Sequence, residues 1–192
     1  LKELLRSEAI GQPLSISAVT GTQTAFVPGT EGSWRVDLQQ SGGGVVMDVG
    51  SHRINLFLDL FGEMVSVTAY GDTLGVDYDA ESCASLIGRF ESGVHANLQC
   101  FFGSGVDPDL FRVIGSHGAL SATPLNSGDL TIDAGGERRV EQHPPAPNFD
   151  TPQIADFVAA IVEDRNPLVD GEEGMRTNEV IERAYARRSP QQ

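Results

Sequence analysis

Four side chains that could carry chemistry recur along one short stretch of the sequence: Asp48, His52, Asn55 and Asp59. At about 100° per residue of an α-helix, these positions fall within an arc of roughly 60°. A carboxylate one turn before a histidine favours the imidazolium form, whereas burial favours the neutral form. The balance can hold an imidazole near neutrality, where a proton carrier works. Asp48 and His52 are therefore candidates for acid/base catalysis.

The same spacing fits two other uses. Asp48 could compensate the helix dipole in the first turn, with His52 a hydrogen-bonded interior histidine. The pair could also supply two ligands of a metal ion, but metal sites usually need three or four protein ligands, and the sequence has no further Cys/His cluster. Spacing alone leaves these interpretations open.

A helix from Val45 to Phe61 must position these side chains. The run is long and mostly apolar, begins after the triple glycine 42–44, and closes at Gly62, a residue that tolerates φ > 0. Because apolar residues cover most of its circumference, we expect a buried helix. Its polar row must then pair internally or face a cavity, since an unpaired buried polar group costs about 1–3 kcal/mol.

Composition limits the classes of protein that the chain can belong to. Its 192 residues and 40% hydrophobic content suit one domain, and the formal net charge of −14 argues against binding nucleic acid or an anionic membrane. No apolar run approaches the ~20 residues of a membrane span, and no signal-peptide pattern opens the sequence. We expect a cytoplasmic protein whose two cysteines are reduced.

The central stretch resembles the signature of the glucose-fructose oxidoreductase / inositol dehydrogenase / MocA family of NAD(P)-dependent enzymes. The resemblance rests on the glycines 42–44, the run Asp48-Val49-Gly50-Ser51-His52, and the apolar helix ending at Gly62-Glu63. It extends to Gly11-Gln12-Pro13 near the start and to Asp170-Gly171-Glu172-Glu173-Gly174 before a last amphipathic helix. In that family the signature opens the first long helix of the C-terminal domain.

The resemblance implies a domain division and a cofactor. Residues 1–12 would be the end of a helix linking to a missing N-terminal dinucleotide-binding domain, and residues 13–192 would form the substrate-binding and oligomerisation domain. NAD or NADP would be bound mainly by the missing domain, because the sequence has no G-x-G-x-x-G turn. The family's catalytic lysine, in a Glu-Lys-Pro motif, would also lie there, so we expect this chain alone to be inactive.

The resemblance also assigns roles within the chain. His52 would be the general acid/base, and Asp48 would orient and tune it. Asn55 occupies a position where the family usually has a substrate-binding aspartate, and an amide can also bind a hydroxyl. Trp34 and Arg35, followed by an acidic residue, match a segment that precedes the glycines in the family and are candidate substrate-binding residues. Alternatively, Trp34 pins a loop onto the helix and Arg35 is a surface ion-pair partner.

The strongest hairpin signal lies between Ser82 and Phe102. Even positions are small or apolar: Ala84, Leu86, Gly88, Phe90, Val94, Ala96, Leu98, Cys100 and Phe102. One face holds all of them only if residues 91–93 form a three-residue loop with Gly93 in the left-handed conformation. That register places Cys83 and Cys100 on opposite faces, so we expect no disulfide.

The odd-numbered face of this hairpin is half polar but retains Ile87 and Phe101, which favours a surface covered by a second subunit. His95 on that face is interpreted as an interface or solvated residue. Other strands are expected over residues 14–27, 64–70, 111–115, 119–122, 128–134 and 138–142. Helices are expected from Thr151, capped by its hydroxyl with Pro152 at the first position, and after Gly174.

These elements predict an α+β fold: a mostly antiparallel open sheet with helices packed on one face. The resulting hypothesis is the substrate-binding and oligomerisation domain of an NAD(P)-dependent oxidoreductase. It would act on a sugar, polyol or related hydroxylated small molecule as a homo-oligomer formed through the open sheet face. The alternative is a non-catalytic assembly module with a structural Asp/His pair.

Overall fold

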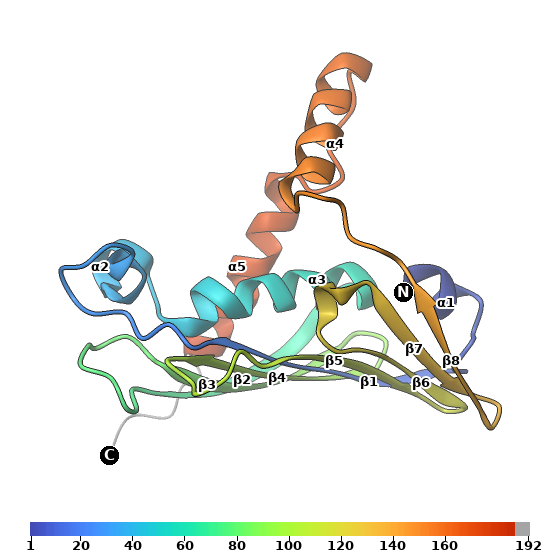
Figure 1. Ribbon diagram of the computed structural model, residues 1–192, viewed down its shortest axis with the longest axis horizontal. Helices are drawn as coiled ribbons and strands as arrows, with labels where there is room; N and C mark the ends of the chain where they lie inside the picture. Colours follow the sequence, from blue (N-terminus) through green and yellow to red (C-terminus); the bar gives the residue numbers. More distant parts are fainter. Residues whose placement is uncertain (187–192) are drawn as a thin grey trace.

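The computed structural model describes residues 1–186 and contains an eight-stranded sheet in the order β2-β3-β4-β1-β5-β6-β7-β8. The strands are β1 (Pro13–Thr22), β2 (Met64–Asp72), β3 (Cys83–Phe90), β4 (His95–Phe102), β5 (Asp109–Gly115), β6 (Gly118–Ala122), β7 (Asp129–Ala134) and β8 (Glu137–Gln142). Neighbours are antiparallel except for β1 and β4, which run parallel. The α+β open sheet is therefore confirmed (Figure 1).

The hairpin of β3 and β4 has the predicted register. Arg89 pairs with His95, and Ala84 pairs with Cys100. Gly93 adopts φ +89° and donates its amide to Phe90 O, which closes the three-residue loop. Both cysteines are free thiols: Cys100 is buried, and Cys83 lies on the opposite face.

The two faces of the sheet differ sharply in burial. Even positions of the hairpin belong to a core shared with the helices, whereas its odd positions, apart from partly buried Cys83 and Phe101, are exposed. The cross-strand pairs extend this open face over the whole sheet, where it carries Tyr70, Ile87, Leu110, Ile114 and Val140 with large exposed areas. The core thus lies on one side only, as a single-layer sheet with one helical cover requires.

Two helices cover the buried face. A π-turn (Val46–Gly50) runs directly into α3 (Ser51–Phe61), and α5 (Gly171–Ala186) packs against both α3 and β2 (Figure 1). Asp170 accepts hydrogen bonds from the amides of Glu172 and Glu173, so the acidic motif near the end of the chain serves as the N-cap of α5. Short helices α1 (Lys2–Arg6) and α2 (Leu38–Ser41) flank this layer.

Helix α4 (Asp150–Glu163) differs from the expectation in two ways. It begins before Thr151, and the side chain of Asn148, rather than the Thr151 hydroxyl, accepts from the first amide. The helix also projects away from the sheet (Figure 1), so its apolar stripe is uncovered. The exposed members are Ile154, Phe157, Val158, Ile161 and Val162.

Hydrogen bonds tie α4 to the connection that follows it. Asp156 accepts hydrogen bonds from Arg165 (2.9 Å) and from the backbone amide of Leu168 (2.7 Å), and these bonds hold the pKa of its carboxyl below the usual range. The connection to α5 is therefore ordered although α4 itself covers nothing.

Other element boundaries differ by a few residues. Strand β1 ends at Thr22 instead of Val27, and the segment of residues 28–41 contains a 3-10 turn (Ser33–Val36) as well as α2. Within residues 1–186, no helix has both the length and the apolar character needed to span a membrane.

Candidate active site

The glycines before the site helix are required by close packing. Gly42 ends α2 at φ +73°, a left-handed conformation that glycine adopts without strain. A Cβ atom on Gly44 would lie 2.2 Å from the carbonyl oxygen of Glu81, and one on Gly50 would lie 3.0 Å from Cys100 Sγ. These contacts bring the helix start onto β4 and onto the connection between β2 and β3.

The predicted helix from Val45 to Phe61 is present, and Gly62 ends it at φ +80°. Its first turn is π-helical, from Val46 to Gly50. A π-turn closes i→i+5 hydrogen bonds, so residues four apart are no longer aligned as in an α-helix. Short single π-turns of this kind are frequent at functional sites.

The expected contact between Asp48 and His52 is not formed. Asp48 Oδ2 lies 3.4 Å from Arg35 Nε instead, and within residues 1–186 no hydrogen bond or ion pair involves His52. The π-turn displaces the i, i+4 pair, and a guanidinium from the preceding loop takes the carboxylate. Both side chains of this ion pair are about one-third exposed.

Trp34 and Arg35 act together in that loop. The Arg35 guanidinium lies 4.5 Å from the centre of the Trp34 ring and 5.8 Å from that of Phe26. Such cation–π contacts fix the direction of the guanidinium, and here they aim it at Asp48. Arg35 is thus an ion-pair partner of the helix, while Trp34 keeps 49% of its surface exposed.

The prediction of a helix buried on nearly all sides is wrong, although Asp48, Asn55 and Asp59 of its polar row do pair with other side chains. Ile54, Phe57 and Leu58 are buried, but His52 and Asp59 are exposed, and Asp48 and Asn55 are partly buried. The apolar residues on the other sides, among them Leu56 and Leu60, are only partly buried against the core. The polar row therefore lies on the surface of the helical layer.

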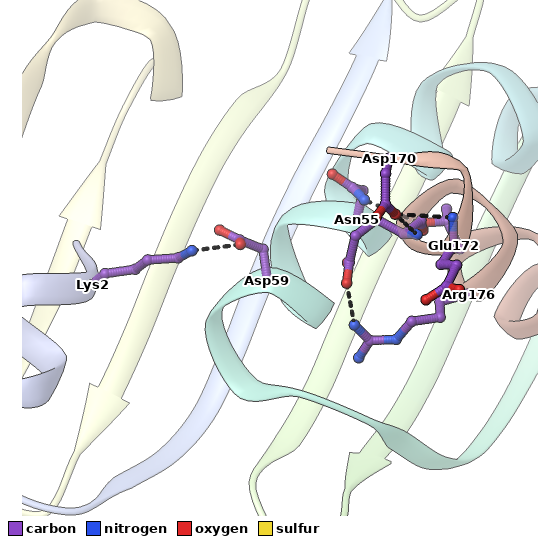
Figure 2. A network of polar contacts seen from close by, with 8 residues as sticks. Lys2, Asn55, Asp59, Asp170, Glu172 and Arg176 are labelled. Carbon is purple, nitrogen blue, oxygen red and sulfur yellow. Dashed lines mark hydrogen bonds and ion pairs between the residues drawn. The ribbon is translucent and has the colours of Figure 1, made fainter. Parts of the chain in front are cut away.

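Two members of the row have partners from distant elements. Asn55 Nδ2 donates to Thr177 Oγ1 of α5 (3.3 Å), and Asp59 pairs with Lys2 of α1. Figure 2 shows Asn55 pointing toward the start of α5 and Asp59 pointing away from it, toward Lys2. The side-chain amide oxygen of Asn55 remains available as an acceptor, so the side chain can still bind a hydroxyl.

Sequence reasoning missed Glu81, which has 1% of its surface exposed and contacts the start of the helix. Its Oε1 accepts hydrogen bonds from Val46 N (3.3 Å) and from Tyr185 Oη (2.6 Å). Burial, with the nearby Glu81 charge, raises the pKa of the Cys100 thiol to about 12 and also raises the pKa of Tyr78. No local pattern distinguishes Glu81 from the exposed acids around it, so only the fold reveals its role.

Asp37, the acidic residue after Trp34 and Arg35, has a structural use. Its side chain caps α2 by accepting from Gln39 N and from Gln40 Nε2, and these hydrogen bonds lower the pKa of its carboxyl. It also lines a cavity of about 990 Å³ between residues 28–40 and 76–79, whose lining includes neither His52 nor Asn55.

The geometry of residues 1–186 argues against a metal site and against a dinucleotide site. Across residues 1–186, no group of three or more His, Cys, Asp or Glu side chains could hold a metal ion. A dinucleotide needs a glycine turn between a strand and a helix N-terminus in a parallel unit. Here Gly43 is packed against Tyr185 and Gly44 against Glu81, a carboxylate that repels phosphate. The described residues therefore do not fit a dinucleotide site.

Comparison with known proteins identifies related chains. The family model described as GFO/IDH/MocA C-terminal domain matches residues 1–121. Among curated proteins, Oxidoreductase P35 from Formosa agariphila is 28% identical over 138 residues, which are 71% of this chain and 42% of that protein. This chain thus spans less than half the length of that relative.

Solved structures share the fold over nearly the whole chain. Aldose-aldose oxidoreductase from Caulobacter crescentus, complexed with glycerol, matches with a TM-score of 0.85 and 27% identity, covering 96% of this chain and 56% of that chain. Levoglucosan dehydrogenase in complex with NADH and levoglucosan matches with a TM-score of 0.78 and 20% identity, covering 97% of this chain and 60% of that one. The second likeness, at this identity, concerns the fold alone.

Proposed function

Because this chain belongs to the GFO/IDH/MocA C-terminal domain family of oxidoreductases, we propose that it is the substrate-binding and oligomerisation domain of an NAD(P)-dependent dehydrogenase. Its substrate would be a sugar, polyol or related hydroxylated small molecule. The observation that carries the proposal is the exposed imidazole of His52, placed directly after the π-turn that carries Asp48, the ion-pair partner of Arg35.

His52 is proposed as the general base that removes the proton from the substrate hydroxyl, and as the general acid that returns it in the reverse direction. General acid/base catalysis needs an imidazole with a ring nitrogen that is free and that the substrate can reach. The exposure of His52, and the absence of a hydrogen bond to it within residues 1–186, support this role. A structural histidine would instead be buried and hydrogen-bonded.

Asp48 and Arg35 are proposed to set the charge beside the imidazole. Asp48 lies within the π-turn that precedes His52, and its ion pair with Arg35 (3.4 Å) brings a carboxylate and a guanidinium to this end of the helix. Arg35, Trp34 and Asn55 are proposed as the substrate-binding side chains. Arg35 offers hydrogen-bond donors and Trp34 an exposed aromatic surface near the start of the site helix, and Asn55 offers an amide on α3 itself.

The cofactor, NAD or NADP, would be held by a dinucleotide-binding domain outside this chain, because Tyr185 and Glu81 occupy the space beside Gly43 and Gly44. The cofactor would accept the hydride when bound; we expect the chain alone to be inactive. The uncovered stripe of α4 is proposed to pack on that domain, since exposed apolar helix faces of this extent mark interaction surfaces.

The open sheet face is proposed to join subunits of a homo-oligomer. Its exposed apolar side chains, including Ile87 and Leu110, alternate with serine, threonine and asparagine, a mixture typical of interfaces that form between folded subunits. Cys83 and Cys100 form no disulfide, which is compatible with a reducing compartment, and we propose a cytoplasmic location.

The experiment that tests the proposal uses the full-length protein with a panel of aldoses and polyols and with NAD+ and NADP+. Reduction of the dinucleotide by at least one substrate is expected, and the His52→Ala variant should lose it. A non-catalytic assembly module would reduce neither dinucleotide and would still form oligomers through the sheet face.

A further inference from the structure

A buried carboxylate controls the start of the site helix. Glu81 lies between β2 and β3, 35 residues beyond Val46 in sequence, yet its Oε1 accepts the hydrogen bond from the Val46 amide (3.3 Å). Its main-chain oxygen accepts from Val45 N (3.0 Å). Two successive amides at the entrance to the π-turn are therefore held by one residue.

Helix α5 completes this contact. Tyr185 Oη donates to the same Glu81 Oε1 at 2.6 Å, and the hydroxyl lies where any side chain on Gly43 would sit. The glycines at 43 and 44 thus give the tyrosine hydroxyl and the Glu81 backbone room to reach the turn. Earlier along α5, Thr177 accepts a hydrogen bond from Asn55, so α5 is linked to the site helix both directly and through Glu81.

Burying a carboxylate costs free energy, and an apolar residue of similar volume in its place is often neutral or stabilising. A role in packing alone would therefore be served better by methionine or leucine. The hydrogen bonds of Glu81 go to the segment that carries Asp48 and leads into His52. This arrangement suits a residue that fixes a geometry rather than one that adds stability.

We propose that Glu81 and Tyr185 are positioning residues, which lock the π-turn and thereby hold Asp48 and His52 in the geometry needed for proton transfer. The proposal rests on the proposed function for its catalytic consequence, but the locking of the turn can be tested without it. Neither residue touches the reacting atoms in this account; both act through the backbone of residues 45–50.

The first test measures hydrogen exchange by mass spectrometry in the full-length protein, comparing Glu81→Met, Glu81→Gln and Tyr185→Phe. Glu81→Met removes the acceptor, and we expect exchange of residues 44–52 to rise about tenfold or more, with the β3–β4 hairpin unchanged. Glu81→Gln keeps a carbonyl acceptor and should restore most of the protection. Unchanged exchange at residues 44–52, or a uniform rise over the whole chain, would overturn the locking role.

Two matched controls accompany these variants. Glu63→Gln changes an exposed carboxylate, and Tyr78→Phe removes a buried hydroxyl that has no hydrogen-bond partner among the residues described. Both should leave exchange at residues 44–52 as in the wild type. Combining Tyr185→Phe with Glu81→Met should add little to Glu81→Met alone, because the two side chains form one unit; full additivity of the two effects would contradict the coupled arrangement.

The second test is kinetic. In the full-length enzyme, Glu81→Met should lower kcat by about tenfold or more while KM changes by less than about twofold, since the loss lies in the alignment of the acid/base. Glu81→Gln should recover most of kcat. An unchanged kcat, despite faster exchange, would overturn the catalytic consequence. Full turnover by His52→Ala would instead refute the proposed function, while the exchange result would still decide whether Glu81 locks the turn.

Discussion

Asp48 Oδ2 lies 3.4 Å from Arg35 Nε, so the first carboxylate of the site helix is paired with the loop that precedes it and not with His52. The same guanidinium lies over the ring of Trp34, 4.5 Å from the ring centre. The loop of residues 28–41 and the π-turn are therefore one polar unit beside the candidate base.

Replacing Arg35 should affect substrate binding more than stability. Arg35→Ala removes an ion pair that is about one-third exposed on each side, and such pairs contribute less than about 1 kcal/mol to the free energy of unfolding. In the full-length enzyme, KM should rise about tenfold, as expected when a polar contact to substrate is lost. Steady-state kinetics and urea unfolding check both values. Arg139→Ala, which removes a more exposed pair, is the control; equal KM in Arg35→Ala and wild type would exclude Arg35 from the binding site.

The close approach at Gly44 predicts a large stability effect of a single methyl group. Gly44→Ala places a Cβ atom 2.2 Å from Glu81 O. This oxygen belongs to the backbone, so it can move away only if the segment between β2 and β3 moves with it. We expect a loss of about 1–3 kcal/mol in the free energy of unfolding, the usual cost of overpacking. Gly105→Ala, where the new Cβ has no neighbour within 4 Å, should change stability little. Urea unfolding of the two variants gives the comparison, and equal midpoints would disprove the tight contact.

The two thiols should differ in reactivity. Burial raises the pKa of Cys100 to about 12, from 9.0 for a free thiol, so at about pH 8 a thiol reagent should modify Cys83 and spare Cys100 until the protein unfolds. The raised pKa means that the folded state favours the protonated thiol of Cys100. The contribution of this thiol to the free energy of unfolding is therefore complete below about pH 9 and is lost as the pH rises toward 12. Peptide mass spectrometry locates the label. Rapid labelling of Cys100 in the native protein would show that the interior beneath Gly50 is open.

A charge on the open sheet face should separate the subunits. Ile87 is 55% exposed on the β3 part of that face, so Ile87→Asp should not disturb folding but should weaken an apolar interface. Light scattering after size-exclusion chromatography should show a smaller particle for this variant. Leu74→Asp changes an equally exposed residue in the loop after β2 and should keep the wild-type mass. Identical masses for all three proteins would place the interface elsewhere.

Patterns that repeat along the chain were sufficient to predict the hairpin. The small or apolar residues at even positions from Ala84 to Phe102 permit one register, and Gly93 fixes the loop that allows it. The same reasoning placed the two thiols on opposite faces and the end of α3 at Gly62. Each of these features depends on residues near one another in sequence, which is why the sequence reveals them.

Contacts between distant segments could not be predicted in this way. The parallel pairing of β1 with β4, the ion pair of Arg35 with Asp48, and the bond from Tyr185 to Glu81 join segments whose sequences carry no mutual signal. The π-turn arises from this packing and displaces a pair that the α-helical period aligns. The face of α4 has the spacing of a buried helix, yet within residues 1–186 nothing covers it.

The turnover of the His52→Ala variant tests the central claim most directly. Full-length wild type, His52→Ala and the control His117→Ala, which alters an exposed histidine at a hairpin tip, are compared for the reduction of NAD+ or NADP+ by the substrate panel. Loss of general acid/base catalysis should lower kcat of His52→Ala by on the order of 10² or more, with His117→Ala unaffected. Equal turnover by His52→Ala and wild type, or no turnover by wild type with any substrate, would contradict the account.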